Sequence, residues 1–191
     1  ATKACDIIPV DEKSYIAGFQ LGKMTDTQDS TGEVLAESDM SVDEDLLRQA
    51  AGEFTGDIMQ LPPMYSAVSV GGKRLYELAR QGKVVEREPR QRRVELIEIQ
   101  EYDKATRQGR MFVTVSKGTY IRTLIHDIGE KIGCYGMMTS LERTSSGGFG
   151  IEECFNLEEI QKYADEDRLG EIVLPVEKAF DSAYDKLKLN R

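Results

Sequence analysis

Arg122 and Tyr120 lie in a segment whose pattern predicts a corner between a strand and a helix. The five residues 111–115 read Met, Phe, Val, Thr, Val, which is the alternation of a half-buried strand. From Ile121 onward the apolar residues recur with helical spacing, up to Gly133, which can end that helix. Arg122 leaves the apolar stripe in the first turn, about 100° from Ile121. Its side chain can therefore project above the sheet and bind an anion. The same spacing also fits a surface arginine that pairs with a nearby acidic residue and has no function in a site.

The composition excludes several classes of protein. The chain of 191 residues is 40% apolar and 31% charged, which is ordinary for a cytosolic domain with one core. It shows no apolar run long enough to span a bilayer and no signal-peptide pattern, so we expect a cytoplasmic protein with no membrane partner. Its three cysteines are widely spaced and His126 is its only histidine, so we expect no disulfide framework and no metal site. His126 lies within the expected helix, where a structural role is more common than a catalytic one.

Charge is distributed unevenly along the chain. The net charge is −9, which argues against a nucleic-acid binder that works by bulk attraction. Between Lys73 and Arg93, however, eight basic residues face three acidic ones, a local excess of +5 that leaves −14 for the remainder. Such a stretch is compatible with contacts to a phosphate backbone, and a solvated helix and strand edge is the alternative.

The expected elements are mainly strands, with helices inserted between them at irregular intervals. Strands are expected over residues 15–21, 34–35, 64–70, 93–102, 110–116 and 141–146. Helices are expected after Ser41, which forms a capping box with Glu44, from Leu75, from Ile121, and after Asn156, which forms a capping box with Glu159.

Apolar residues of both parities in 93–102 predict a bulged or two-sided strand, which pairs most simply with 110–116 as an antiparallel neighbour. The whole pattern predicts an α+β fold with a mixed, mainly antiparallel sheet and flanking helices. We expect one domain over residues 1–180 and a polar tail over 181–191.

Several segments of the chain together resemble one known family. They are Tyr15, the loop 25–29, Met64–Ala67, Gly72–Gly82, Ser116–Arg122 and Gly129–Cys134. In this order they resemble the TruB-type tRNA pseudouridine synthases, which isomerise one uridine, at position 55 in the T loop of tRNA. The resemblance runs from about residue 1 to about residue 155. It implies the pseudouridine synthase fold, tRNA as partner, a monomer, and no organic cofactor or metal, because the reaction has no redox step.

The resemblance also implies roles for single residues. Arg122 corresponds to the family arginine that pairs with the catalytic aspartate, and a nearby cation keeps a carboxylate ionised. Tyr15 corresponds to the tyrosine that packs against the target base, where a flat ring replaces the stacking lost on extrusion. The same pocket would be lined by Tyr120, Leu141, Asp29 and Lys117. Phosphates would be held by Lys73, Arg74, Arg90, Arg92 and Arg93. Without the resemblance, Tyr15 and Leu141 would be interpreted as plain core residues.

One part of the family pattern is missing from this sequence. The nucleophilic aspartate of the family lies in a Gly-x-Leu-Asp segment upstream of the stretch that residues 1–5 resemble, and the sequence contains no such segment. It also ends at Arg191, before the C-terminal RNA-binding domain called PUA. We therefore expect an enzyme whose N-terminal segment supplies the aspartate, and we expect this chain alone to be inactive. The alternative is a non-catalytic RNA-binding or RNA-folding module.

Overall fold

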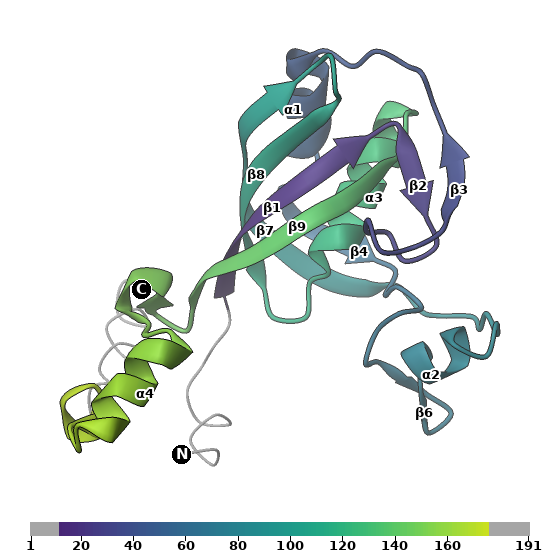
Figure 1. Cartoon of the computed structure of the whole chain (residues 1–191). Coiled ribbons are helices and arrows are strands. Elements are labelled where there is room, and N and C mark those ends of the chain that lie inside the picture. Colours follow the sequence, from purple (N-terminus) through teal and green to yellow (C-terminus); the bar gives the residue numbers. More distant parts are fainter. Residues whose placement is uncertain (1–11, 176–191) are drawn as a thin grey trace. The chain divides into compact units, whose positions relative to one another are not determined.

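The computed structural model describes residues 12–175, so the expected tail over 181–191 lies outside the described residues. The chain divides into two compact units. The larger comprises Ser14–Glu142, and the described residues of the smaller are 12–13 and 143–175. Helices and strands occur together along the described chain, which confirms the α+β class (Figure 1). The single domain over 1–180 stays a prediction.

A six-stranded sheet in the order β10-β9-β1-β8-β7-β4 is the frame of the fold (Figure 1). Its strands are β1 (Glu12–Leu21), β4 (Gly56–Gln60), β7 (Arg90–Asp103), β8 (Gln108–Ser116), β9 (Gly136–Ser146) and β10 (Phe149–Gly150). The pairs β4–β7, β7–β8 and β9–β10 are antiparallel. The mainly antiparallel sheet expected from the sequence is therefore confirmed.

Strand β7 is bulged, as its mixed parity predicts. Its pairing with β8 shifts register between Val94 and Leu96 and again between Ile99 and Glu101. A bulge places one extra residue on one strand and so changes which parity faces the core. Val94 and Ile99 are consequently both buried, although an unbroken strand would point them to opposite faces.

Two small hairpins and four α-helices complete the described chain. The hairpins are β2 (Lys23–Thr25) with β3 (Val34–Glu37), and β5 (Ser69–Val70) with β6 (Lys73–Arg74). The helices are α1 (Glu44–Gly52), α2 (Leu75–Ala79), α3 (Ile121–Ile132) and α4 (Leu157–Asp165), with 3₁₀ turns at Ile151–Glu153 and Leu169–Glu171. None of the described helices is both long enough and apolar enough to cross a membrane.

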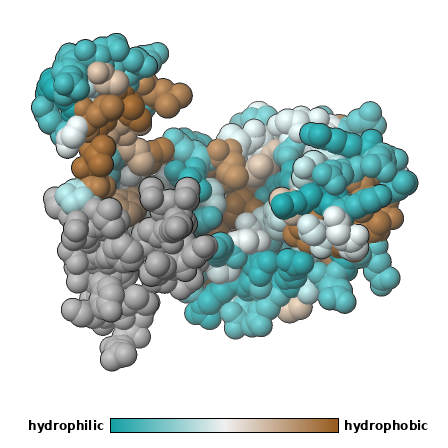
Figure 2. All heavy atoms as spheres, turned by 90° about the horizontal axis from the view of Figure 1, so that it is seen from below, coloured by the Kyte–Doolittle hydropathy of each residue, from teal (hydrophilic) through white to brown (hydrophobic). Residues whose placement is uncertain are grey.

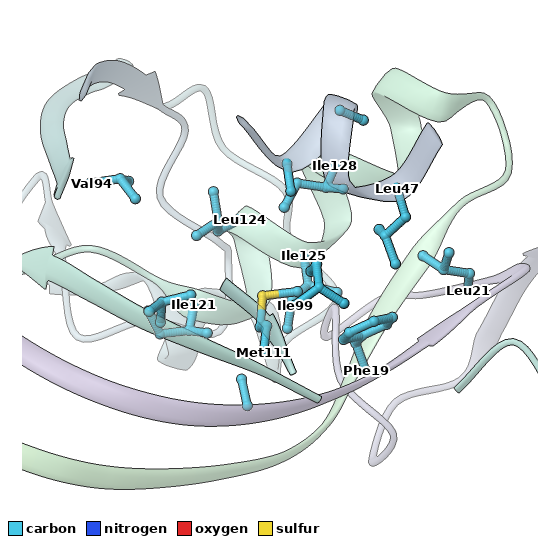
Figure 3. Close-up of a cluster of buried hydrophobic side chains, with 14 of the residues drawn as sticks. Phe19, Leu21, Leu47, Val94, Ile99, Met111, Ile121, Leu124, Ile125 and Ile128 are labelled. Carbon is cyan, nitrogen blue, oxygen red and sulfur yellow. The ribbon is translucent and has the colours of Figure 1, made fainter. Parts of the chain in front are cut away.

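One apolar cluster in the larger unit packs α1 and α3 against the sheet (Figure 3). The residues that α3 contributes to it are Ile121, Leu124, Ile125 and Ile128. Figure 3 shows Ile121 and Ile125 near Met111 and Phe19 of the sheet and Ile128 near Leu47 of α1, and all these side chains are buried. The cluster fixes the rotation of α3 about its axis, because turning the helix would expose this stripe. Arg122 is thereby held off the buried face.

The start of α1 differs from the expected one. The helix begins at Glu44 after the N-cap residue Asp43, so Ser41 forms no capping box with Glu44. Val42 is fully buried, and its carbonyl oxygen accepts a hydrogen bond of 3.1 Å from the Tyr102 hydroxyl of β7. This contact holds the chain just before Asp43, which is extended with φ of −83° and ψ of 151°, and the helix begins two residues later than expected. Tertiary packing has overridden the local capping signal.

The strand expected over 64–70 is wrong except at Ser69–Val70. The segment that precedes it includes Pro62 and Pro63, which have no N–H for a sheet ladder. Between Pro62 and Val68, two carbonyl groups accept hydrogen bonds from the first backbone N–H groups of α2, and three accept from arginine side chains. The pairs are Arg87 with Pro62 at 2.9 Å, Arg74 with Ala67 at 2.7 Å, and Arg122 with Tyr65. Guanidinium groups and the start of α2 thus bond this segment in place of a neighbouring strand.

In the smaller unit, Asn156 caps α4 as expected. Its Oδ1 accepts a hydrogen bond of 2.9 Å from the Glu159 backbone N–H, and the Glu159 carboxylate accepts one of 2.8 Å from the Asn156 N–H. No residue of α4 is buried within the described part of the chain, and Leu157 is 85% exposed. Figure 2 shows apolar side chains gathered on this unit. With so little packing, the cap is a large part of what stabilises this helix.

Candidate functional site

The corner between β8 and α3 is the centre of the candidate site. Strand β8 ends at Ser116, Gly118 turns the chain with a φ of 85°, and α3 begins at Ile121. Tyr120 is the N-cap residue, with extended φ and ψ of −97° and 108° and no side-chain cap hydrogen bond. The corner predicted from the sequence is confirmed, and Arg122 projects from its first helical turn.

Arg122 is bonded at two points on its guanidinium group. Its Nη1 lies 3.0 Å from Oδ2 of Asp29, and its Nη2 donates to the backbone carbonyl of Tyr65. The Arg122 and Asp29 side chains are only 19% and 16% exposed. Both residues were expected at the site from the sequence, but their pairing and the carbonyl of Tyr65 were not.

The Asp29 carboxylate is held in its ionised form by its neighbours. Its Oδ1 accepts hydrogen bonds from the Thr27 hydroxyl at 2.8 Å, the Thr31 hydroxyl at 2.5 Å and the Thr31 backbone N–H at 3.1 Å. Burial alone would raise the pKa of Asp29, but the hydrogen bonds from Thr31, Thr27 and Arg122 lower it below the ordinary 3.8. Arg122 therefore faces a full negative charge at neutral pH.

The loop that carries Asp29 is fastened to two other elements. The Ser30 N–H donates to the Met138 carbonyl at 2.8 Å, and the Met138 N–H donates to the Gln28 carbonyl at 3.1 Å, so the loop pairs with β9. The Thr123 hydroxyl of α3 donates to Oε1 of Gln28 at 2.7 Å. Asp29 is consequently placed by β9 and α3 together.

Several other residues expected in the base pocket are not bonded to Arg122 in the described part of the chain. Tyr15 is on β1, partly buried, and packs against the apolar cluster. Leu141 is on β9 and 46% exposed, and Lys117 is exposed in the turn before α3. Within residues 12–175, no hydrogen bond or ion pair links Tyr15 or Lys117 to Arg122. Their expected roles stay predictions.

A cavity of about 460 Å³ lies close to the pair in the larger unit. Tyr65, Gln28 and His126 line it, whereas none of the side chains expected in the base pocket does. Nδ1 of His126 is buried and has no hydrogen-bond partner among the described residues. Burial lowers the pKa of His126 against the opposing effect of Glu130, so its imidazole is neutral at pH 7.

The basic stretch is partly occupied by contacts within the chain. Arg92 donates to the Gly118 carbonyl at 3.0 Å, and Arg93 pairs with Glu95 and, at 3.5 Å, with Asp57. Arg74 donates to a backbone carbonyl, as described above. Lys73 and Arg90 are exposed and have no ion-pair partner within residues 12–175. These two side chains are the most available to a phosphate.

Comparison with known proteins identifies the family. Residues 1–121 match the model for the TruB family pseudouridylate synthase (N terminal domain), and residues 122–181 match that for the tRNA pseudouridylate synthase B C-terminal domain. Both models describe pseudouridylate synthases. The chain belongs to the TruB family, as its motifs predicted.

Relatives and solved structures agree with this assignment. The chain is 42% identical over its full length to tRNA pseudouridine synthase B of Clostridium tetani, of which it covers 64%. It is 45% identical to the protein of that name from Pseudomonas syringae over 85% of this chain and 52% of the relative. Thus the chain spans less than two thirds of the length of these relatives.

Two solved structures share the fold over 95% of this chain. A Cbf5-Nop10-Gar1 complex matches with a TM-score of 0.68 and 29% identity, over 47% of the matched chain. An H/ACA RNP bound to a substrate RNA containing 2′-deoxyuridine matches with a TM-score of 0.66 and 26% identity, over 45% of that chain. The expected pseudouridine synthase fold is confirmed.

Proposed function

We propose that this chain contributes the orienting and stacking part of an active site that converts uridine 55 in the T loop of tRNA to pseudouridine. The observation that supports this most directly is the Arg122–Asp29 pair at the strand–helix corner, in a chain 42% identical to a tRNA pseudouridine synthase B. A partly buried guanidinium fixed by two partners is suited to aiming a carboxylate.

In this proposal, the N–H donors of Arg122 that have no partner within the described residues bind that carboxylate. A guanidinium has five N–H donors. Arg122 directs Nη1 to Asp29 and Nη2 to Tyr65, while its Nε makes no hydrogen bond within the described residues. In this proposal the remaining donors hold the aspartate of a Gly-x-Leu-Asp segment, which this sequence lacks. The cation lowers the pKa of the incoming carboxylate and keeps it nucleophilic.

The reaction then needs a flipped base and no redox partner. The aspartate attacks the uracil ring or its ribose, the N-glycosidic bond breaks, and the uracil turns. A bond from a ring carbon to the ribose replaces the bond from nitrogen, and the bond to the aspartate breaks. The ring carbon loses its proton and the freed ring nitrogen gains one, so the product is an isomer of the substrate. The ring of Tyr15 stacks on the extruded base, and Tyr120, Leu141 and Lys117 border it. Lys73 and Arg90 hold phosphates and set the register of the RNA.

The test is pseudouridine formation on a tRNA transcript, with and without a polypeptide that contains the Gly-x-Leu-Asp segment. We expect product only when that segment is present. Arg122→Ala should lower the single-turnover rate constant about 100-fold, because a small misplacement of the reacting groups has an effect of that size. The tRNA dissociation constant should change little.

Arg48→Ala is the matched control, since Arg48 forms an exposed pair with Glu44 on α1. It should alter neither rate nor affinity. Equal losses of catalysis and binding in Arg122→Ala would contradict the proposed role. Specific tRNA binding without product in every mixture would favour the non-catalytic RNA-binding module.

A further inference from the structure

Gln60 makes an unusual contact with the corner that carries Arg122. It is the last residue of β4 and is only 1% exposed. Its Nε2 donates to the Tyr120 carbonyl at 3.1 Å, and its Oε1 accepts from the Tyr120 N–H at 2.8 Å. One buried side chain thus bonds both backbone groups of a residue 60 positions away. It acts on the corner as a neighbouring strand would.

The corner needs such a partner. Tyr120 is the N-cap of α3, where the first N–H groups of a helix have no partner inside the helix. No side chain within the described residues caps this helix, although the Tyr120 carbonyl does accept the Leu124 N–H at 3.0 Å. Without Gln60, the Tyr120 N–H would be left unbonded in a partly buried position. The amide therefore fixes the direction in which the chain enters α3.

Gln60 and Arg122 also close a ring of contacts. From Gln60 the chain runs through the buried prolines 62–63 to Tyr65, whose carbonyl accepts from Arg122. Arg122 is two residues after Tyr120, and the Tyr120 carbonyl accepts the hydrogen bond from Gln60 that closes the ring. The prolines fix φ along this path and limit its freedom to adjust. The distance between the Tyr65 carbonyl and the guanidinium is thus set from both ends of the segment.

We infer that Gln60 is a positioning residue. It fixes the direction of the Arg122 side chain and the position of Tyr120 and does not contact the substrate. The inference rests on the proposed function, because aim matters only if Arg122 orients a reacting group. Its consequence is that loss of the Gln60 amide lowers the rate of the chemical step and leaves tRNA affinity almost unchanged.

Gln20 provides a matched control for the loss of a buried amide. It is 9% exposed, and its Nε2 donates to the carbonyls of Leu21 and Thr106, both at 2.9 Å. Gln60→Met and Gln20→Met each remove a buried amide and keep the side-chain volume. Both substitutions should lower the melting temperature. A difference in catalytic rate between the two variants would therefore be due to the contact of Gln60 with the β8–α3 corner.

The experiment compares single-turnover pseudouridine formation by the two variants, with the Gly-x-Leu-Asp segment supplied. We expect Gln60→Met to lower the rate constant about 10- to 100-fold with little change in tRNA dissociation constant, and Gln20→Met to leave both near wild type. In an Arg122→Lys background, Gln60→Met should have almost no further effect, because the two changes act on one group. Equal rate losses in the two methionine variants, or additive losses with Arg122→Lys, would overturn the inference.

Two further measurements keep the test decisive. If Gln60→Met does not fold, Gln60→Glu retains an acceptor for the Tyr120 N–H, and only its protonated form can donate to the Tyr120 carbonyl. Its rate relative to wild type should then rise as the pH is lowered, and a flat ratio would count against the inference. If the wild type forms no pseudouridine, the proposed function fails. The NMR resonance of the Arg122 Nε–H should still shift in Gln60→Met and not in Gln20→Met, and an unchanged resonance in both would refute the positioning role.

Discussion

Removing the Asp29 carboxylate should destabilise the larger unit by more than the loss of a surface ion pair. Exposed pairs contribute about 0–1 kcal/mol, and breaking a fully buried pair costs about 3–5 kcal/mol. Arg122 and Asp29 are 19% and 16% exposed, which places the pair between these limits. Arg122 would still donate to Tyr65. We therefore expect Asp29→Ala to lower the free energy of unfolding by about 2 kcal/mol.

Urea denaturation at pH 7 measures this, with Glu95→Ala as the control. Glu95 pairs with Arg93, whose side chain is 56% exposed, so its removal should cost clearly less than the removal of Asp29. The two variants should be distinguishable. Equal losses would refute the view that burial makes the Asp29 pair stronger.

Acid provides an independent check of the same pair. The folded-state pKa of Asp29 is lowered, so its stabilising contribution is fully present above the unfolded value of 3.8 and is lost as the pH falls through the folded value. Asp29→Asn lacks this proton uptake. Its stability should therefore fall less steeply than that of the wild type below about pH 4. Parallel curves would show that the carboxylate is not selectively stabilised in the folded state.

Three other predictions concern separate parts of the chain. Replacing Lys73 and Arg90 by glutamine should weaken tRNA binding and reduce the salt slope by about 1–2 in a titration, and Arg93→Gln should do less because Arg93 is already paired. Burial and, after it, the charge of Glu130 raise the pKa of Asp127 to about 6, so the stability of the wild type should decline as the pH rises from about 4 to 6. Asp127→Asn should remove about 1 kcal/mol of that decline, measured by urea denaturation at several pH values. Asn156→Ala should destabilise α4 by about 1 kcal/mol, measured by hydrogen exchange.

Local patterns in the sequence predicted those parts of the fold that depend on periodicity. The stripe from Ile121 to Ile128 identified α3 and its buried face, and Gly133, with a φ of 86°, ends the helix as expected. The mixed parity of β7 identified its bulges. In these cases each residue's environment follows from its near neighbours. Periodicity is then sufficient.

Predictions failed where a distant contact decided the local conformation. The bond from Tyr102 to the carbonyl of Val42 joins residues 60 positions apart and displaces the start of α1. Residues 64–68 belong to an expected strand but form none, because their carbonyl groups accept hydrogen bonds from arginine side chains and from the first backbone N–H groups of α2. Neither set of contacts can be predicted from the spacing of residues in the sequence. Spacing can indicate which conformations a segment tolerates, but not which partner it will meet.

The candidate site combines both situations in one side chain. Periodicity turns Arg122 away from the core, and this much could be predicted. Its final direction depends on Asp29, 93 residues away, and on Tyr65, 57 residues away. The loop of Asp29 is held by Met138, and the segment of Tyr65 is tied to the corner by Gln60. Met138 and Gln60 therefore help to set the surroundings of the Arg122 guanidinium although neither bonds to it, and substitutions among these residues should combine non-additively.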